Sequence, residues 1–564
     1  DELDLNWWGG TGAGAIRLDS PEGETVLVVG ELKAPGVSLG SLLLGGRDFG
    51  MVTADGVDVH LERDASGQWG LVRALASTDT DKESEPLRWP DGWAGRLDVT
   101  GRAEVVVPDR PPVILPDLKA FADARNRGAL KVEAKSSACQ DDVCGDFQLA
   151  LSVDDLVGAD GMVALSAAKV DLLMEAVGLP PATVDQLANA AGRWEALAGG
   201  AVDVTVTAEG PLSRVNGKVV VKAPRLEGQS QVVGSDQGLE LAATRFTAQV
   251  DGQSFPKLVG VSGVDLAGTS EVVLEVESAA VARTASGLDW ANAHLKARVH
   301  STAVPVGVKG VDRPLTFERF ELNVDSERLA DGISVAGGMQ VSGDRGSPGS
   351  MSLDARVDQL IDGEGQPGLK TAKAHGELLL RDLPAPLVER LAGGDDWTAT
   401  AGVERLNVTA SAAASLASGR PVGPISLEVQ TAGGGNAAEA ERSLALKVAM
   451  KPEGDRLVLT ETASLDARII PAILMRLRDR TWGLPQDLAT VLADMSPSQP
   501  ARVALRLTDL SVPLDLTAPS GPIRFEGSMG LEAGLKRQPQ PTQLSVSTRW
   551  KKMALAMDTW SFLE

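Results

Sequence analysis

The side chains that most often bind metals or perform acid–base catalysis are few and scattered in this sequence. Its four histidines are His60, His294, His300 and His375. None of them has the H-x₃-H or H-E-x₂-H spacing of zinc sites. Each lies in a run of alternating apolar and polar residues, which favours a solvated or strand-packed histidine. The sequence therefore predicts no metal site and no cofactor.

Nucleophile and phosphate-binding motifs are also missing. The segment from Gly10 to Gly14, Gly-Thr-Gly-Ala-Gly, lacks the third glycine of a dinucleotide-binding loop and is interpreted as a turn. The sequence has neither a G-x-S-x-G elbow nor a Walker lysine. Carboxylates are numerous but spread over polar positions, so no acid–base pair can be singled out. We predict no catalytic residues and expect that the protein is not an enzyme.

Two cysteines, Cys139 and Cys144, are separated by Gln-Asp-Asp-Val in a polar stretch between two strand-like segments. The pair supplies too few ligands for zinc. Two free thiols are one alternative, but a close pair in a loop favours a small disulfide. A disulfide would indicate an oxidising compartment.

Composition limits the classes of partner. The 564-residue chain has a net charge of −23 and no long basic segment, which argues against nucleic acid as a partner. Aromatic residues make up only 4% and tyrosine is absent, which is unusual for a sugar-binding or adhesive surface. No segment approaches the roughly 20 consecutive apolar residues that span a membrane.

A repeated module organises the chain. Short apolar segments begin at Pro181, Pro384, Pro471 and Pro485, and their aliphatic residues recur at helical spacing. Proline suits the first turn of a helix, because its missing N–H would have no intrahelical partner there. Long segments with alternating apolar and polar residues follow these helices and predict strands with one apolar face. The repetition favours an extended array of similar units.

The expected fold is mainly β with a few short helices, built from helix-plus-strand modules. We expect three regions: an amino-terminal β region over 1–107, a β region over 108–380 and another over 381–564. Helical modules are predicted near 116–125 and 169–197 in the second region. In the third they are predicted near 384–393 and 470–493.

The predicted helices are too few to cover the apolar face of so many strands. We therefore expect an elongated, strongly curved antiparallel sheet that forms an open groove, with the helices as plugs or edge covers. Acyl chains fit such a groove. Its candidate lining residues are Val202, Val204, Val206, Leu444, Leu446, Val448, Val503, Leu505 and Leu507.

The sequence also resembles the AsmA-like family of double-membrane bacteria, which is similar to TamB and to bridge-like lipid-transfer proteins. The resemblance rests on the segment from Phe49 to Leu71, the segment from Leu18 to Leu27, and the recurrent Leu/Ile-Pro-x-x-Leu helix followed by alternating strands. It implies a periplasmic β-groove that conducts phospholipid towards the outer membrane. It also implies an amino-terminal helix that tethers the full-length protein to the inner membrane.

Two functions from different classes follow as hypotheses. In the first, the groove binds or conducts phospholipid or another acyl-chain lipid between the inner and outer membranes, or assists outer-membrane assembly with envelope protein partners. In the second, the chain is a structural or adhesive β-rich surface protein whose sheets close on each other. A single open sheet would favour the first, and a closed double sheet the second.

Overall fold

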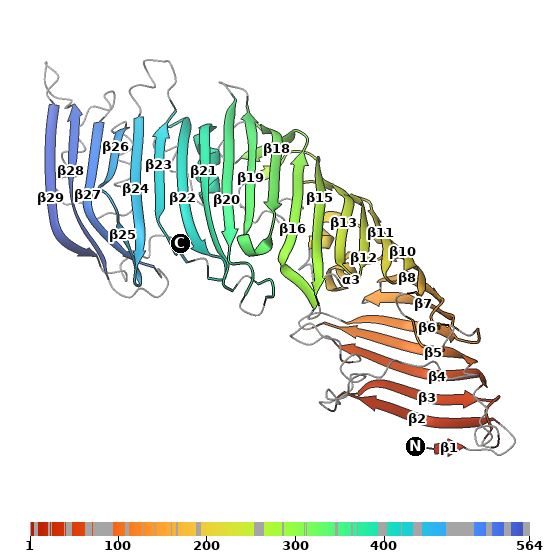
Figure 1. Cartoon of the computed structure of the whole chain (residues 1–564). Helices are drawn as coiled ribbons and strands as arrows, with labels where there is room; N and C mark the ends of the chain where they lie inside the picture. The colour runs from red at the N-terminus through yellow and green to blue at the C-terminus, as the bar shows by residue number, and fades with distance from the viewer. Residues whose placement is uncertain are drawn as a thin grey trace. The chain divides into compact units, whose positions relative to one another are not determined.

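The computed structural model describes residues 2–4, 10–20, 23, 25–38, 40, 48–62, 70, 94–107, 112–126, 128–140, 143–158, 161–164, 167–187, 193–252, 264–284, 287–308, 311, 313–343, 348–362, 365–368, 370–392, 403–418, 420–432, 443–469, 501–514, 522–534 and 543–555. These residues are mainly β strands with a few short helices, which confirms the predicted fold class (Figure 1).

The chain divides into two compact units. Unit 1 comprises Asp1–Gln249 and Val273–Leu288, and unit 2 comprises Val250–Val272 and Asp289–Glu564. This division differs from the expected boundaries near residues 107 and 380, of which the second falls inside the strand Lys373–Pro384.

Unit 1 contains most or all of fourteen strands. They are β1 (Glu2–Asp4), β2 (Thr11–Asp19), β3 (Thr25–Ala34), β4 (Asp48–Glu62), β5 (Ala94–Val106), β6 (Val113–Asp123), β7 (Leu130–Gln140), β8 (Val143–Asp154), β9 (Lys169–Leu179), β10 (Val202–Pro211), β11 (Arg214–Ala223), β12 (Leu226–Ser235), β13 (Gly238–Val250) and β15 (Ser270–Thr284). Its described helices are α3 (Pro181–Leu187) and α4 (Arg193–Ala198).

Unit 2 contains the remaining strands. They are β14 (Val264–Leu266), β16 (Gly287–Ser301), β17 (Val304–Val308), β18 (Leu315–Ser326), β19 (Ile333–Ser342), β20 (Gly349–Asp358), β21 (Lys373–Pro384), β22 (Arg405–Ser415), β23 (Ile425–Thr431), β24 (Ser443–Glu453), β25 (Arg456–Leu459), β26 (Ala463–Ile469), β27 (Ala501–Pro513), β28 (Ile523–Gly534) and β29 (Gln543–Leu555). Its described helices are α6 (Ala385–Leu391) and the 3₁₀ turn η1 (Leu329–Asp331).

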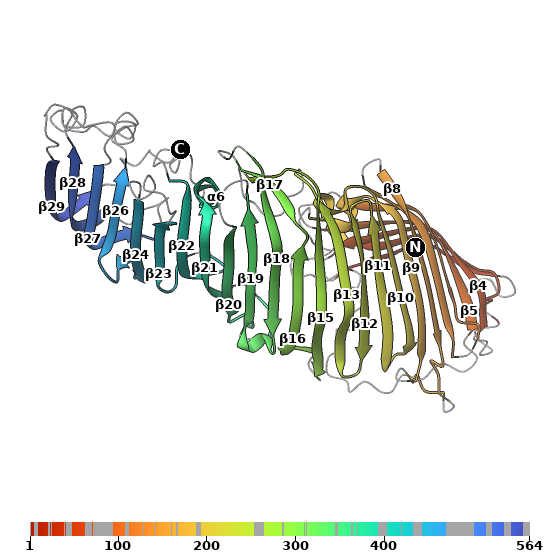
Figure 2. The same cartoon turned by 90° about the horizontal axis from the view of Figure 1, so that it is seen from above.

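Neighbouring strands along the chain pair antiparallel through most of each unit, as hairpins do. Unit 1 has one exception, because β4 and β5 pair in parallel over Asp48–Glu62 and Ala94–Val106. The alternation of residues within each strand gives no indication of strand direction, so the sequence did not predict this pair. Figure 2 shows the strands of each unit side by side in one layer.

Two sequence interpretations are corrected by the strands. The helix predicted near 116–125 is strand β6, in which Leu118, Ala120 and Ala122 alternate on one face. Pro116 is tolerated there because it falls where the β6–β7 register shifts, at a bulge. The predicted turn from Gly10 to Gly14 is largely strand β2.

The helical modules were predicted with mixed success. Residues 169–179 form strand β9, so the module near 169–197 is helical only from Pro181 onwards, as α3 and α4. The module near 384–393 is confirmed as α6. The modules near 470–493 lie outside the described residues.

In each unit, a group of buried residues lies where these helices meet the strand ends. In unit 1 they are Leu179, Val202, Leu226 and their neighbours under α3 and α4. In unit 2, Leu383, Leu387 and Leu406 are each at most 1% exposed around α6. The helices therefore cover one end of the strands rather than a whole face.

Candidate functional site

The four histidines lie on strands, and His60 and His375 each lie near a carboxylate. His60 Nδ1 lies 3.5 Å from Glu104 Oε2, and His375 Nδ1 lies 3.3 Å from Asp358 Oδ2. His294 and His300 belong to β16. Within the described ranges, no group of three His, Cys, Asp or Glu side chains is placed to hold a metal ion.

Two depressions lie over polar strand positions. One, of 570 Å³, is lined by Asp354, Arg356, His375 and Glu377 among others. The other, of 440 Å³, includes Lys119, Lys135 and Glu175. Both are open and lined by charged side chains that alternate with the apolar positions of the same strands, so they do not resemble enclosed sites for an apolar ligand.

The strand registers place apolar side chains in continuous rows across each unit. Successive side chains on a strand point to opposite faces, and directly paired residues share a face. In unit 2, one row runs from β19 to β28 and contains only Met, Leu and Val: Met339, Met351, Leu380, Val408, Val429, Leu446, Leu465, Leu505 and Met529. We call the face that bears this row the unit 2 apolar face.

The neighbouring row, one residue along each strand, belongs to the opposite face. Apart from Leu379, its residues are hydroxyl-bearing or charged: Ser352, Thr409, Glu428, Lys447, Ser464, Arg506, Ser528 and Arg549. The sheet of unit 2 is therefore strongly two-sided.

Unit 1 has the same two-sided construction. Its apolar face bears the row Leu32, Ala54, Val99, Ala120, Ala134, Leu149, Met174, Val206 and Val219. Three side chains of this face, Ile16, Leu97 and Leu239, are 39%, 37% and 45% exposed. Large apolar side chains are thus accessible on the face that a globular protein would cover.

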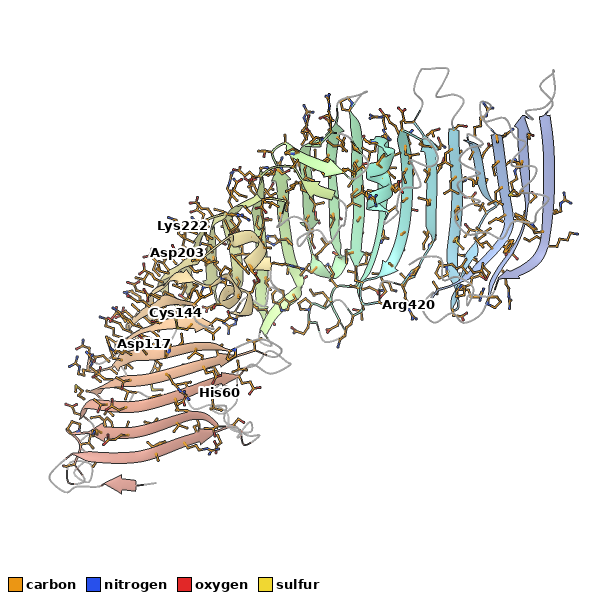
Figure 3. All side chains as sticks on the ribbon, turned by 180° about the vertical axis from the view of Figure 1, so that it is seen from behind. His60, Asp117, Cys144, Asp203, Lys222 and Arg420 are labelled. Atoms are coloured by element: carbon orange, nitrogen blue, oxygen red, sulfur yellow. A yellow bond between two sulfur atoms is a disulfide. The ribbon has the colours of Figure 1, made fainter. Side chains whose placement is uncertain are left out.

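No second sheet packs on these faces in the part of the chain that the structure describes. The main contacts between strands of a unit are those between hydrogen-bonded neighbours. Apart from these, α3 contacts β7, and α6 contacts β17, β21 and β22. Figure 3 shows the helices lying against one face of the strands, with side chains projecting along the rest.

The two helical plugs, defined as α3 with α4 in unit 1 and α6 in unit 2, begin in the same way. Each follows a Leu-Pro pair, Leu179-Pro180 or Leu383-Pro384, at the end of a bulged strand. In unit 1 the backbone N–H of Gly178, whose φ is +71°, donates to Asp203 Oδ1 over 2.8 Å.

In unit 2 the corresponding residue is Asp382, with φ of +52°. Its N–H donates to Asn407 Oδ1 over 2.8 Å. In both modules, therefore, a side-chain oxygen on the next strand accepts the hydrogen bond of a backbone N–H group in the bulge. The two described modules thus share the same arrangement before the helix.

The nine predicted groove residues lie on apolar faces, but not in equivalent surroundings. Val204 and Val206 are half-buried on unit 1, whereas Val202 is fully buried by the plug and is not accessible. In unit 2, Leu446 and Leu505 both pair with Leu465, and Leu444 and Val503 both pair with Ala467. Val448 and Leu507 lie on the same face, further along β24 and β27.

Most residues of both rows were not among the predicted groove residues. Met351, Leu380 and Val429 in unit 2 and Leu149 and Met174 in unit 1 occupy positions equivalent to the predicted residues. The same alternation of apolar and polar residues identifies them in β8, β9, β20, β21 and β23.

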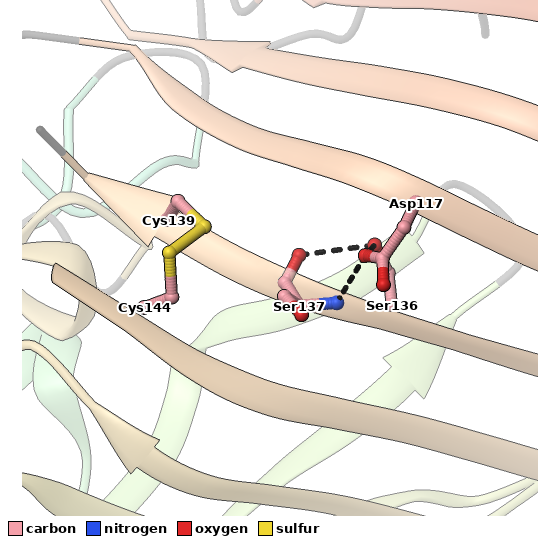
Figure 4. Close-up of a disulfide and its surroundings, with 5 residues drawn as sticks. All are labelled: Asp117, Ser136, Ser137, Cys139 and Cys144. Atoms are coloured by element: carbon pink, nitrogen blue, oxygen red, sulfur yellow. Dashed lines mark hydrogen bonds between the residues drawn. A yellow bond between two sulfur atoms is a disulfide. The ribbon is translucent and has the colours of Figure 1, made fainter. Parts of the chain in front are cut away.

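The disulfide between Cys139 and Cys144 is confirmed and closes the β7–β8 hairpin. Beside it, Asp117 Oδ1 accepts a 2.7 Å hydrogen bond from the backbone N–H of Ser137 (Figure 4). This bond lowers the pKa of Asp117, with help from the Ser136 hydroxyl. The carboxylate thereby satisfies a backbone group beside the bulge in β6.

No described helix combines the length and the apolar character required to cross a membrane. Comparisons with protein-family models, curated proteins and solved structures find no match to this chain.

Proposed function

We propose that the apolar faces of the two units bind the acyl chains of phospholipid or of a similar lipid. The single observation behind this proposal is the two-sided sheet, on whose apolar faces the described helices lie at one strand end while side chains such as Ile16, Leu97 and Leu239 stay exposed. A face of Leu, Val and Met that lacks a second layer needs an apolar partner, and acyl chains are such a partner.

The energetics favour this use. Moving a two-chain lipid of about 32 methylenes into water costs on the order of 25 kcal/mol, at about 0.8 kcal/mol per methylene. Transfer from a bilayer to an apolar protein face exchanges one apolar medium for another. A protein that only lowers this cost requires no catalytic group.

The resemblance to AsmA-like proteins suggests the setting: the periplasm, with tethering to the inner membrane and transfer of lipid between the two membranes or assistance to outer-membrane assembly. The disulfide supports an oxidising compartment such as this. The alternative, a structural or adhesive protein with closed sheets, requires a second layer, and the described strands provide no observation in its favour.

The test uses two pairs of substitutions on single strands. Leu505→Asp and Val206→Asp place a carboxylate on the apolar faces, whereas Ala504→Asp and Thr205→Asp place it on the opposite face of the same strands. Binding of a fluorescent fatty acid and lipids that copurify with the chain are measured. We expect the apolar-face variants to bind about tenfold or more weakly, because a carboxylate is costly against acyl chains.

The controls should bind like the parent chain. Equal binding by all five proteins, or no copurifying lipid and no probe binding by the parent, contradicts the proposal. Circular dichroism of each variant checks that the strands are retained.

A further inference from the structure

The disulfide of unit 1 lies at an accessible position. Cys144 is exposed and Cys139 is half-buried, at the end of the β7–β8 hairpin where the polar face of the sheet meets solvent. Accessible disulfides are the ones that external thiolates reduce most readily, because attack requires direct approach to a sulfur atom. Buried structural disulfides lack this reactivity.

The residue next to this disulfide attaches the plug of unit 1. Gln140, only 7% exposed, accepts a 3.1 Å hydrogen bond at Oε1 from Thr183 Oγ1. Thr183 is completely buried in α3. The hairpin end and the helix are therefore joined by a polar contact that water does not reach, and such a contact is lost if either partner moves.

In the plug of unit 2, an apolar residue stands at the position that corresponds to Thr183. Counting from the shared Leu-Pro pair, Leu387 occupies the position of Thr183 and is 1% exposed. Its contact is apolar packing, which does not depend on the position of one hairpin side chain. The chain has no cysteines besides Cys139 and Cys144, so only the first plug is linked to a disulfide.

A carboxylate contact links α3 to α4, so that displacement of α3 would also affect α4. Asp185, 4% exposed in α3, accepts hydrogen bonds from the backbone N–H groups of Trp194 and Glu195 over 3.0 Å each. These residues begin α4. Displacement of α3 therefore also removes the partners of the first turn of α4.

We propose that Cys139–Cys144 is a thiol–disulfide exchange site that controls the attachment of the α3–α4 plug. A dithiol attacks the exposed sulfur of Cys144, forms a mixed disulfide and then closes its own disulfide. The S–S bond of the protein breaks, two electrons and two protons pass from the dithiol, and both cysteines become thiols. The hairpin end then frays, Gln140 leaves Thr183, and the plug loosens from the end of the unit 1 apolar face.

The experiment measures hydrogen exchange of the whole chain before and after treatment with dithiothreitol, the dithiol probe. Alkylation with iodoacetamide counts the thiols formed. On reduction, we expect the backbone amides of residues 182–187 and 193–198 to exchange at least about threefold faster, as locally opened segments do. Residues 385–391 of α6 serve as the internal control and should not change.

Two variants sharpen the result. The double substitution Cys139→Ser and Cys144→Ser should show fast exchange in α3 and α4 without dithiothreitol, and no response to it. Thr183→Val keeps the shape but removes the donor to Gln140, so the plug should exchange fast in both redox states.

Complete alkylation with unchanged exchange in α3 overturns the proposal. Equal acceleration of α3, α4 and α6 also overturns it, because the disulfide would then stabilise the chain generally. Failure of dithiothreitol to reduce the folded chain overturns the exchange site itself. The readout is amide exchange, so the outcome does not depend on whether the apolar faces bind lipid.

Discussion

Many charged side chains of the described residues pair with a neighbour two residues away on the same strand, and others pair across strands. Arg96 with Asp98 and Lys131 with Glu133 are examples, two residues apart on one face and 2.8 and 2.7 Å between charged atoms. Exposed pairs of this kind contribute little to stability, typically less than about 1 kcal/mol. Their role is to keep the polar face soluble while the opposite face stays apolar.

Asp123, which pairs with Arg125, is the carboxylate of these ion pairs whose charge we expect to affect stability most. Arg125 Nε lies 2.9 Å from Asp123 Oδ1, and the backbone N–H of Arg125 donates to the same oxygen over 3.0 Å. These hydrogen bonds lower the pKa of Asp123 to about 2. A folded-state pKa below the unfolded value stabilises the protein above the unfolded pKa of about 3.9, and this stability is lost as pH falls towards 2.

We therefore expect Asp123→Asn to lower the free energy of unfolding by about 1 kcal/mol at pH 7, a value reduced for the exposure of Arg125. The difference from the parent chain should shrink between pH 4 and pH 2, in the range set by the lowered pKa. Urea denaturation at pH 7 and pH 2.5 measures it, if the units unfold reversibly. A difference that stays constant over this range would contradict the role of the charge.

At the residue scale the sequence predicted the disulfide and the face of each candidate groove residue, because both follow from local spacing. It did not predict that Val202 is covered while Val204 and Val206 are accessible. That difference depends on where α3 and α4 lie on the sheet, which alternation within β10 does not contain.

At the scale of elements, the bulge before each plug is held by one side chain from the next strand. Asp203→Ala and Asn407→Ala should each leave one backbone N–H, of Gly178 or Asp382, without its partner. We expect about 1 kcal/mol of local destabilisation for each. Hydrogen exchange should rise in the plug of the affected unit only, and a rise in both plugs would contradict this independence.

The packing of α6 allows a second element-scale prediction. Leu387 is 1% exposed and Leu391 is 42% exposed on the same helix. Leu387→Ala should cost about 3 kcal/mol, because it leaves a cavity at the strand ends. Leu391→Ala is the matched control and should change stability by less than about 0.5 kcal/mol. Thermal unfolding of the two variants compares them, and equal losses would show that α6 is not anchored through Leu387.

Among the described residues, two of the three Leu-Pro pairs that were predicted to start helices do so. The pairs at residues 179–180 and 383–384 precede helices, whereas the pair Leu115-Pro116 lies in β6. Both contexts place proline before apolar residues, and the deciding factor is tertiary: Ala120 and Ala122 each pair with a strand on either side. Such pairing overrides the local preference.

At the scale of the whole molecule, the accessible surface is 32750 Å² for 58.7 kDa. A compact protein of this mass would expose about 19,000 Å², and two separate compact halves about 23,000 Å². The accessible surface of this chain exceeds both the value for one compact protein and the value for two separate compact halves. Single-layer sheets contribute to this excess, since the described strands contact mainly their hydrogen-bonded neighbours and a few short helices.

Unfolding should consequently expose less new surface than for a compact protein of equal length. We expect the heat-capacity change on unfolding to be about 15 to 20% below the usual value per residue. Scanning calorimetry of the delipidated chain measures it. A value typical of compact globular proteins would indicate that the apolar faces are covered in solution.

The parallel pairing of β4 with β5 has a consequence for how the chain acquires its structure. Most other pairs in unit 1 are antiparallel neighbours along the chain, and many are joined by short connections, so such a strand can add to the sheet soon after it is synthesised. The β4–β5 pair instead requires the chain between Glu62 and Ala94 to cross before pairing begins. We expect this closure to be the slowest step in folding of unit 1, and the strands from β5 onwards to form a sheet before β4 joins it.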